Sequence, residues 1–226
     1  FNNATASIIA ILIGLAFGFI ILIISNPGNA MEGLKTILMG GFSGGGRGLG
    51  QVLYMATPLI LTGLSVGFAF KTGLFNIGAA GQFIMGGITA IYIGVHWTFL
   101  PAPFHWIVAL IMATIVGAIW GFIPGLLKAY CNVHEVIATI MMNYIGMYLS
   151  NYLVKTTVFD TKKSISMDVA STAEIPKGGL DNIFFTQIGT FKETASVNTG
   201  IFIAIVVASL IYYILNKTTF GYELKA

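Results

Sequence analysis

The segment GLFNIGAAGQ, residues 73–82, joins two long apolar stretches without a normal polar loop. It places two amide side chains, Asn76 and Gln82, in an apolar run that glycines interrupt. Residues six apart on a regular helix point about 240° apart, so either the helix is broken near Gly78 or the two amides have different roles. Irregular backbone at membrane depth is stable only inside protein or beside an aqueous cavity, which is where transporters bind their solutes. We therefore interpret each amide either as part of a translocation pathway or as an interhelical hydrogen-bonding group.

The composition places the chain in a lipid bilayer. Of its 226 residues, 56% are hydrophobic and 8% are charged, whereas soluble domains carry roughly 25% charged residues. The mean hydropathy is +0.88, and the 28 glycines are typical of transmembrane rather than soluble helices. The net charge of +3 comes from scattered residues that form no basic face, which argues against a nucleic-acid partner. Cys131 is the only cysteine, which excludes an internal disulfide.

Six apolar stretches are long enough to cross about 30 Å of hydrocarbon as helices. They are residues 8–24, 52–70, 74–95, 106–127, 136–154 and 200–215. We predict an all-α fold, a polytopic transmembrane helical bundle in which residues 1–226 form a single transmembrane domain. Within it, the polar connection 155–199 is expected to form a partly folded extracytoplasmic loop. The glycine-rich residues 26–51 are too broken to span the membrane and are expected at the surface.

Small residues recur at four-residue spacing, the pattern that lets membrane helices approach closely. The sets are Gly14 with Gly18, Gly63 with Gly67, Ala90 with Gly94, and Gly117 with Gly121 and Gly125. We expect these faces to pack on neighbouring helices.

The distribution of lysines predicts the orientation in the membrane. If the six helices alternate in direction, one side carries Lys71, Lys128, Lys217 and Lys225. Short loops that carry lysine stay in the cytoplasm, so this side is predicted to be cytoplasmic, together with the N-terminus. Lys35 and Arg47 fall on the opposite side and count against this orientation.

The stretch 136–154 and the residue before it carry polar or small side chains along one face. These are Glu135, Thr139, Asn143, Gly146 and Ser150, at three- and four-residue spacing. Such a stripe faces protein or water rather than lipid. For Glu135 we favour a capping box with Asn132 as N-cap. We assign Thr139 and Asn143, with Asn76 and Gln82, to a translocation pathway, and packing between helices is the alternative.

No pattern of catalytic or metal-binding residues accounts for the chain. Residues 41–48 have the glycine spacing of a phosphate-binding loop, but Arg47 and Gly48 stand where that loop has lysine and serine or threonine. His134 and Glu135 lack the second histidine of a zinc-protease helix, because residue 138 is alanine. We predict a protein that is not an enzyme and that uses no cofactor and no metal.

At residues 73–82 the chain resembles a known family. The run GLFNIGAAGQ is similar to the G-L-[FW]-N-I-G-A-E-G-Q signature of bacterial permeases of nucleoside-type ABC importers. These permeases form one branch of the nucleoside and simple-sugar permeases, which are related to branched-chain amino acid and ribose permeases. Ala80 stands where the signature has glutamate, so the motif contains no acid here. Residues 58–64, PLILTGL, and 132–144, NVHEVIATIMMNY, resemble two further motifs, and the similarity runs from residue 52 to the end.

The resemblance implies a permease subunit of an ATP-driven importer that moves a nucleoside or simple sugar across a bacterial plasma membrane. It also implies three partners: a separate ATPase subunit, a second permease subunit in a homo- or heterodimer, and an extracytoplasmic substrate-binding protein or lipoprotein. The chain begins at Phe1 and ends at Ala226 in a polar segment, so we expect further sequence at both ends. Two alternatives are kept: a secondary transporter driven by an ion gradient, disfavoured by the few membrane carboxylates, and a membrane scaffold without transport activity.

The last residues resemble the family's T-x-F-G-Y-[EK]-L-[RK]-A motif, which leads into the cytoplasmic helix that contacts the ATPase. The resemblance assigns ATPase coupling to Phe220, Gly221, Tyr222, Glu223, Leu224 and Lys225. Without the resemblance, this segment is typical of a basic juxtamembrane turn.

Overall fold

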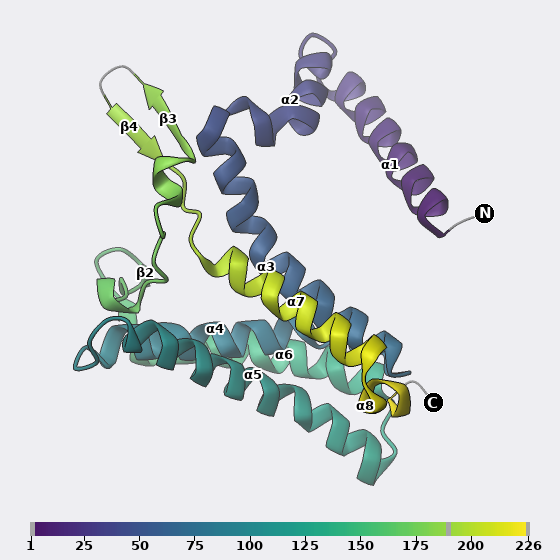
Figure 1. Cartoon of the computed structure of the whole chain (residues 1–226). Coiled ribbons are helices and arrows are strands. Elements are labelled where there is room, and N and C mark those ends of the chain that lie inside the picture. The colour runs from purple at the N-terminus through teal and green to yellow at the C-terminus, as the bar shows by residue number, and fades with distance from the viewer. Residues whose placement is uncertain (1–2, 189–190, 225–226) are drawn as a thin grey trace. The chain divides into compact units, whose positions relative to one another are not determined.

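The computed structural model describes residues 3–188 and 191–224, and most of them are helical (Figure 1). The α-helices are α1 Asn3–Ser25, α2 Ala30–Ser43, α3 Gly45–Lys71, α4 Ala79–His96, α5 Phe104–Cys131, α6 Glu135–Thr157, α7 Gly200–Lys217 and α8 Thr219–Glu223. Two 3₁₀ turns, η1 Ser171–Ala173 and η2 Leu180–Asn182, lie in the connection between α6 and α7. The strands pair as two antiparallel hairpins, β1 Phe159–Asp160 with β2 Ile165–Ser166, and β3 Phe185–Ile188 with β4 Phe191–Thr194. The predicted all-α class is confirmed.

Among the described residues, five helices are long and apolar enough to cross a membrane. They are Thr5–Ser25 of α1, α3, α4, α5 and α7. α6 has 23 residues, about 34 Å of helix, but its asparagines and its terminal charges make it less apolar than the others. Five of the six predicted spans are therefore confirmed by length and composition, and the crossing by α6 stays a prediction.

Two boundaries differ from the sequence-based expectation. The predicted span 74–95 begins later, because residues 74–78 are not helical and α4 starts at Ala79. The glycine-rich residues 26–51 are mostly helical and contain α2 and the first turns of α3. α2 has 14 residues, about 21 Å of helix, which is too short to cross the hydrocarbon core. The expectation that this segment does not span by itself therefore agrees with its length. It also agrees with the break at Gly44 and Gly45, where α2 ends and α3 begins and where Gly45 has φ of +59°.

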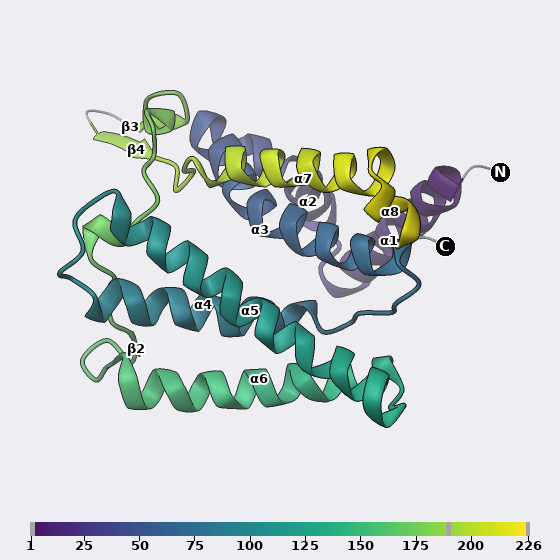
Figure 2. The same cartoon turned by 60° about the horizontal axis from the view of Figure 1, so that its bottom comes forward.

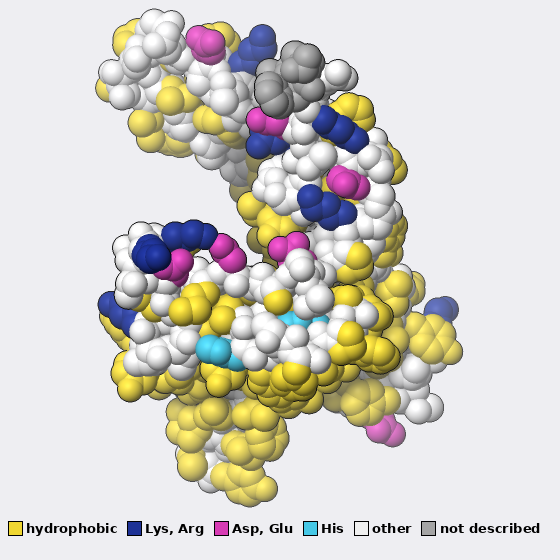
Figure 3. All heavy atoms as spheres, turned by 90° about the vertical axis from the view of Figure 1, so that its left-hand side faces the viewer, with side chains coloured by type: hydrophobic (Ala, Val, Ile, Leu, Met, Phe, Trp, Pro, Cys, Tyr) yellow, Lys and Arg dark blue, Asp and Glu magenta, His cyan; other side chains and the backbone are white. Residues whose placement is uncertain are grey.

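The chain divides into two compact units. One unit contains Phe1–Tyr54 and Gly179–Val197, and the other contains Met55–Gly178 and Asn198–Ala226. Large apolar side chains are exposed along helices of both, and hydrophobic side chains cover much of the helical surface seen in Figure 3. Most charged side chains in that view lie in its upper part, whereas hydrophobic side chains dominate its lower part. An apolar exterior of this kind is what a lipid environment requires.

In the first unit, the glycines at the start of α3 make room for the hairpin β3–β4. A Cβ atom on Gly46 would lie 2.7 Å from the Phe185 carbonyl oxygen. The Thr186 hydroxyl donates to the Gly44 carbonyl at 2.6 Å, and Arg47 forms an ion pair with Glu193 at 2.5 Å. The glycine spacing that is similar to a phosphate-binding loop therefore serves close packing between backbones in this chain.

In the second unit, α4 packs between α5 and α6 through small residues (Figure 2). A Cβ atom on Gly86 would lie 2.9 Å from the Ala113 carbonyl oxygen of α5, and one on Gly81 would lie 3.1 Å from the Met142 carbonyl oxygen of α6. Of the predicted small-residue sets, Gly117 and Gly121 lie at the α4 interface. Two sets make no such contact: a Cβ atom on any of these glycines would have no described neighbouring atom within 4 Å. These are Gly14 with Gly18 on α1 and Gly63 with Gly67 on α3.

A buried histidine holds the C-terminal end of α4 and the N-terminal end of α5 against the connection that follows α6. His105 has no exposed surface. Its Nε2 is hydrogen-bonded to the Ile93 carbonyl at 3.1 Å, and its Nδ1 to the Thr172 hydroxyl at 2.8 Å. The Ala170 amide also donates to the Gly94 carbonyl at 2.9 Å. The first part of the predicted loop 155–199 is therefore held against the helix ends.

Candidate functional site

The chain leaves α3 through a tight turn. The Thr72 amide donates to the carbonyls of Phe68 and Ala69, and the Leu74 amide also donates to Ala69 at 2.9 Å. Gly73 has φ of +73°, a conformation that costs residues with a side chain about 1–2 kcal/mol. This glycine allows α3 to end and the connecting segment, residues 72–78, to turn toward α4.

Two asparagines hold the connecting segment. Asn76 Oδ1 accepts from the Gly78 amide at 2.8 Å, immediately before α4 begins. Asn143 of α6 bridges the break, because its Oδ1 accepts from the Gly81 amide at 2.8 Å and its Nδ2 donates to the Ile77 carbonyl at 2.9 Å. These side chains satisfy backbone groups that the interrupted helix leaves without partners. The predicted helix is thus interrupted up to Gly78: Asn76 lies before α4 and Gln82 lies within it, so the two amides also have different positions.

A pocket of about 150 Å³ lies where the end of α3, the connecting segment, α5 and α6 meet. Most of its walls are apolar, and they carry a few amide, hydroxyl and charged groups. The lining residues are Phe68, Ala69, Thr72, Leu74, Phe75, Asn76, Gly121, Pro124, Gly125, Lys128, Glu135 and Thr139. A mainly apolar cavity with a few convergent polar groups is typical of a ligand site.

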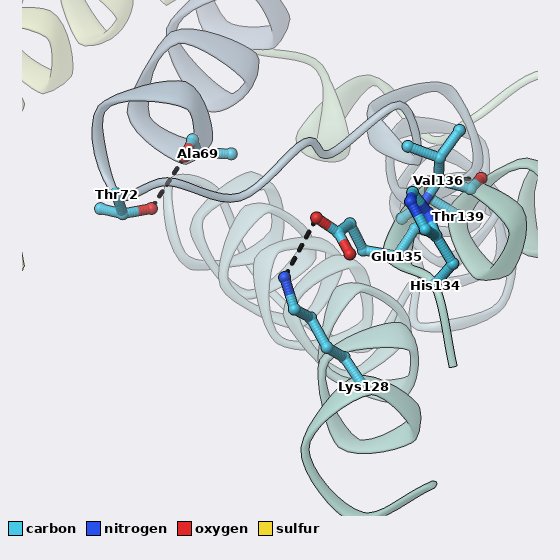
Figure 4. Close-up of polar contacts among 7 residues, drawn as sticks. All are labelled: Ala69, Thr72, Lys128, His134, Glu135, Val136 and Thr139. Carbon is cyan, nitrogen blue, oxygen red and sulfur yellow. Dashed lines mark hydrogen bonds and ion pairs between the residues drawn. The ribbon is translucent and has the colours of Figure 1, made fainter. Parts of the chain in front are cut away.

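An ion pair forms one side of this pocket. Lys128 Nζ, in the last turns of α5, lies 3.0 Å from Glu135 Oε1, at the start of α6, and Figure 4 shows the two side chains pointing toward each other. The Glu135 side chain is 22% exposed and the Lys128 side chain 38%. The pair is thus partly shielded from water, which strengthens it compared with a pair on an open surface.

The turn between α5 and α6 corrects one prediction. Asn132 does not cap α6; it ends α5 in the left-handed conformation, with φ of 54°. The N-cap of α6 is His134, whose Nδ1 accepts from the Val136 amide at 3.4 Å. The capping box with Glu135 is therefore wrong, and Glu135 forms the ion pair with Lys128. Asparagine suits a left-handed helix end as well as an N-cap, so its identity alone did not distinguish the two.

The four predicted pathway residues occupy different places. Asn76 and Thr139 line the pocket. Gln82 is half-buried against α5, where a Cβ atom on Gly121 would lie 2.7 Å from its Nε2. Asn143 is bonded to the backbone around the break. Their assignment to a pathway stays a prediction for all four.

Sequence reasoning missed Phe75, Lys128 and Glu135 as members of this site. From the sequence, Lys128 indicates only the orientation, and Glu135 belongs to the polar stripe with a capping box as its favoured role. A signal was present, because a lysine near the end of one helix and a glutamate at the start of the next are opposite charges across a short turn.

The end of α7 forms a second candidate site. The Thr218 hydroxyl donates to the Ile214 carbonyl at 2.6 Å and accepts from the Gly221 amide at 3.1 Å. A Cβ atom on Gly221 would overlap the Ile214 carbonyl oxygen, so this turn requires glycine. Phe220 and Tyr222 are 57% and 77% exposed beside it. A rigid turn with exposed aromatic side chains suits contact with another protein.

The other predicted coupling residues continue this turn. Glu223 ends α8 and Leu224 follows it, whereas Lys225 lies outside the described residues. The C-terminal ends of α3, α5 and α7, where Lys71, Lys128 and Lys217 are found, lie at one end of their unit in both Figure 1 and Figure 2. This grouping agrees with the lysine pattern that predicts a cytoplasmic side.

Comparison with known proteins gives a family for the chain. The model of the family described as the permease component of the branched-chain amino acid transport system matches residues 48–226. No solved structure matches the chain significantly.

Three relatives are transporter permeases. The guanosine ABC transporter permease protein NupP of Bacillus subtilis is 39% identical over 225 residues, which cover 100% of this chain and 61% of that protein. The nucleoside ABC transporter permease protein NupB of Lactococcus lactis is 33% identical over 230 residues, covering 100% of this chain and 62% of that protein. The glucose ABC transporter permease protein TsgB13 of Haloferax volcanii is 32% identical over 185 residues, covering 78% of this chain and 46% of that protein. The chain thus spans about three fifths of the length of the first two relatives.

Proposed function

The chain belongs to the family of permease components of the branched-chain amino acid transport system, and from this we propose that it is part of the membrane-spanning subunit of an ATP-driven importer. The family match over residues 48–226 carries the proposal. The solute is a nucleoside or simple sugar, because the relatives at 39% and 33% identity are named for guanosine and nucleosides and a third, at 32%, for glucose. The subunit itself does no chemistry, and a separate ATPase supplies the energy.

The translocation pathway passes the pocket beside the connecting segment. Asn76 and Thr139 place an amide and a hydroxyl in the pocket wall, and a polar solute needs such groups within an apolar bundle. Irregular backbone that lines a cavity supplies solute sites in other transporters, and this pocket lies toward the predicted cytoplasmic end of its helices. Gln82 and Asn143 support this region from the neighbouring turn of α4 and from α6.

Three protein partners complete the transporter. The ATPase subunit contacts residues 220–225, where Gly221 fixes the angle at which the chain leaves α7. A second permease subunit, identical or different, completes the pathway. A substrate-binding protein or lipoprotein delivers the solute from outside, to the side that carries the connection 155–199. The complex lies in the bacterial plasma membrane, with the N-terminal end of this chain on the cytoplasmic side.

Uptake measurements in cells test this function. The full-length permease is expressed with its ATPase and binding protein, and uptake of radiolabelled uridine and glucose is followed. Two conditions separate the energy sources: an ATPase subunit whose phosphate-loop lysine is replaced, and a protonophore added under conditions that maintain cellular ATP. We expect uptake of at least one solute to be lost with the ATPase variant and kept with the protonophore. Uptake that survives the ATPase variant and stops with the protonophore would instead indicate a secondary transporter.

A further inference from the structure

We propose that the pocket beside Lys128 and Glu135 binds the hydroxyl-bearing sugar ring of the transported solute, and that this ion pair recognises the ring's hydroxyl groups. The inference rests on the proposed function, since it concerns the solute in transit. It goes further by naming which part of the solute the pocket holds and which side chains recognise it.

The size of the pocket favours one ring. Its volume is about 150 Å³, whereas pockets that enclose a whole drug-sized ligand are roughly 300–1,000 Å³. This volume lies below the range in which a whole nucleoside-sized ligand is enclosed. A single furanose or pyranose ring fits, with any attached base outside the polar part of the pocket.

The polar groups around the pocket match the hydroxyls of a sugar. The Glu135 carboxylate pairs with Lys128 and also accepts from its own backbone amide. Its two oxygens offer about four acceptor positions in all, so it can also accept from a hydroxyl. The Thr139 hydroxyl already donates to the Glu135 carbonyl at 2.8 Å, and the Thr72 hydroxyl to the Ala69 carbonyl at 2.9 Å. Their oxygens are therefore left as acceptors, and Lys128 is the matching donor.

The neighbouring apolar walls fit the remaining surface of such a ring. Phe68 and Phe75 line the same pocket as the ion pair. The C–H faces of a sugar and the face of an attached base are apolar and pack on aromatic rings. A ribonucleoside and a free sugar both combine adjacent hydroxyls with an apolar face. A free base, or a nucleoside that lacks the 2′ and 3′ hydroxyls, does not have this combination.

The competing explanation gives the ion pair a structural role only. Lys128 and Glu135 lie on either side of the turn between α5 and α6, so the pair could do no more than hold that turn closed. In that case neutralising Glu135 would lower the stability of the protein and leave its discrimination between solutes unchanged.

The test uses a cysteine at a pocket residue as the reporter. Ala69 is 8% exposed and lines the pocket, so a small thiol reagent reaches an Ala69→Cys variant through that pocket. The full-length transporter, assembled with its ATPase and with Cys131 and all other cysteines replaced by serine, is labelled in the presence of uridine, ribose, 2′,3′-dideoxyuridine or uracil. Uridine and ribose should slow the labelling, and the other two compounds should not. Equal protection by uridine and dideoxyuridine, or no protection by any of the four, would overturn the proposal.

A matched pair of variants then assigns the recognition to Glu135. Hydrogen bonds to a charged group contribute enough that Glu135→Gln should raise the uridine concentration needed for protection by about tenfold or more. Glu32→Gln, on an exposed turn of α2, should leave that concentration unchanged. Unchanged protection in Glu135→Gln would refute the role of the ion pair. Uptake measured in parallel distinguishes failure of this inference from failure of the proposed function. Normal ATP-driven uptake without protection of the cysteine would refute the inference alone. Absence of uptake in the wild type would refute the proposed function.

Discussion

Replacing Asn143 by alanine tests whether this amide stabilises the broken start of α4. The substitution removes the bonds to the Gly81 amide, at 2.8 Å, and to the Ile77 carbonyl, at 2.9 Å. A buried polar group without a partner costs about 1–3 kcal/mol, but measured interhelical hydrogen bonds in a membrane protein average about 0.6 kcal/mol. Two groups at about 0.6–3 kcal/mol each give an expected fall in the free energy of unfolding of about 1–6 kcal/mol.

The assay is reversible unfolding of the full-length protein in mixed micelles with increasing dodecyl sulfate, followed by circular dichroism. Asn151→Ala is the matched control, because Asn151 is an exposed asparagine on the same helix. The Asn143→Ala transition should move to lower dodecyl sulfate, and the Asn151→Ala transition should stay close to that of the wild type. If the two variants unfold together, Asn143 does not hold the break, and lining of the pathway becomes the better explanation for its presence.

Three further changes test other parts of the account. Gly221→Ala places a Cβ atom against the Ile214 carbonyl oxygen, so solute-stimulated ATP hydrolysis should fall while the binding protein still docks. The control Gly63→Ala, which has open space around it, should hydrolyse ATP at the normal rate. Equal rates of hydrolysis for the two variants would contradict the coupling assignment. Gly46→Ala would meet the Phe185 carbonyl oxygen at 2.7 Å, and we expect faster proteolysis of the hairpin β3–β4 than in Gly63→Ala. A reporter fused after Lys128 should be cytoplasmic and one inserted near Gly178 extracytoplasmic; cytoplasmic signals from both would show that the span count is wrong.

The sequence was sufficient to predict the class of fold and the position of most helices. Apolar stretches of membrane length are unambiguous when only 8% of residues are charged. The break at Gly78 was foreseen as one of two possibilities, because Asn76 and Gln82 cannot share a face of a regular helix. What selects the break is Asn143, which is far away in the sequence, and its bonds to Ile77 and Gly81 could not be read from local pattern.

Contacts between distant segments also explain the other differences. The glycine-rich segment breaks only between α2 and α3, at Gly44 and Gly45. Gly45 and Gly46 also leave room for a hairpin more than a hundred residues later in the sequence, which a local pattern cannot reveal. Asn132 has a side chain suited to both helix ends, and the observed backbone, with φ of 54°, selects the end of α5. The pocket was not predictable for the same reason, since its walls come from α3, α5 and α6 and from the segment between α3 and α4.

Reconstitution tests the central claim most directly. The full-length permease, its ATPase and its binding protein are placed in proteoliposomes with ATP supplied on the ATPase side and without any ion gradient, and accumulation of radiolabelled uridine and glucose is measured. The account predicts accumulation of one of these solutes against its gradient that requires ATP, and loss of that accumulation when the permease is omitted. Accumulation that needs an imposed ion gradient and proceeds without ATP would contradict it.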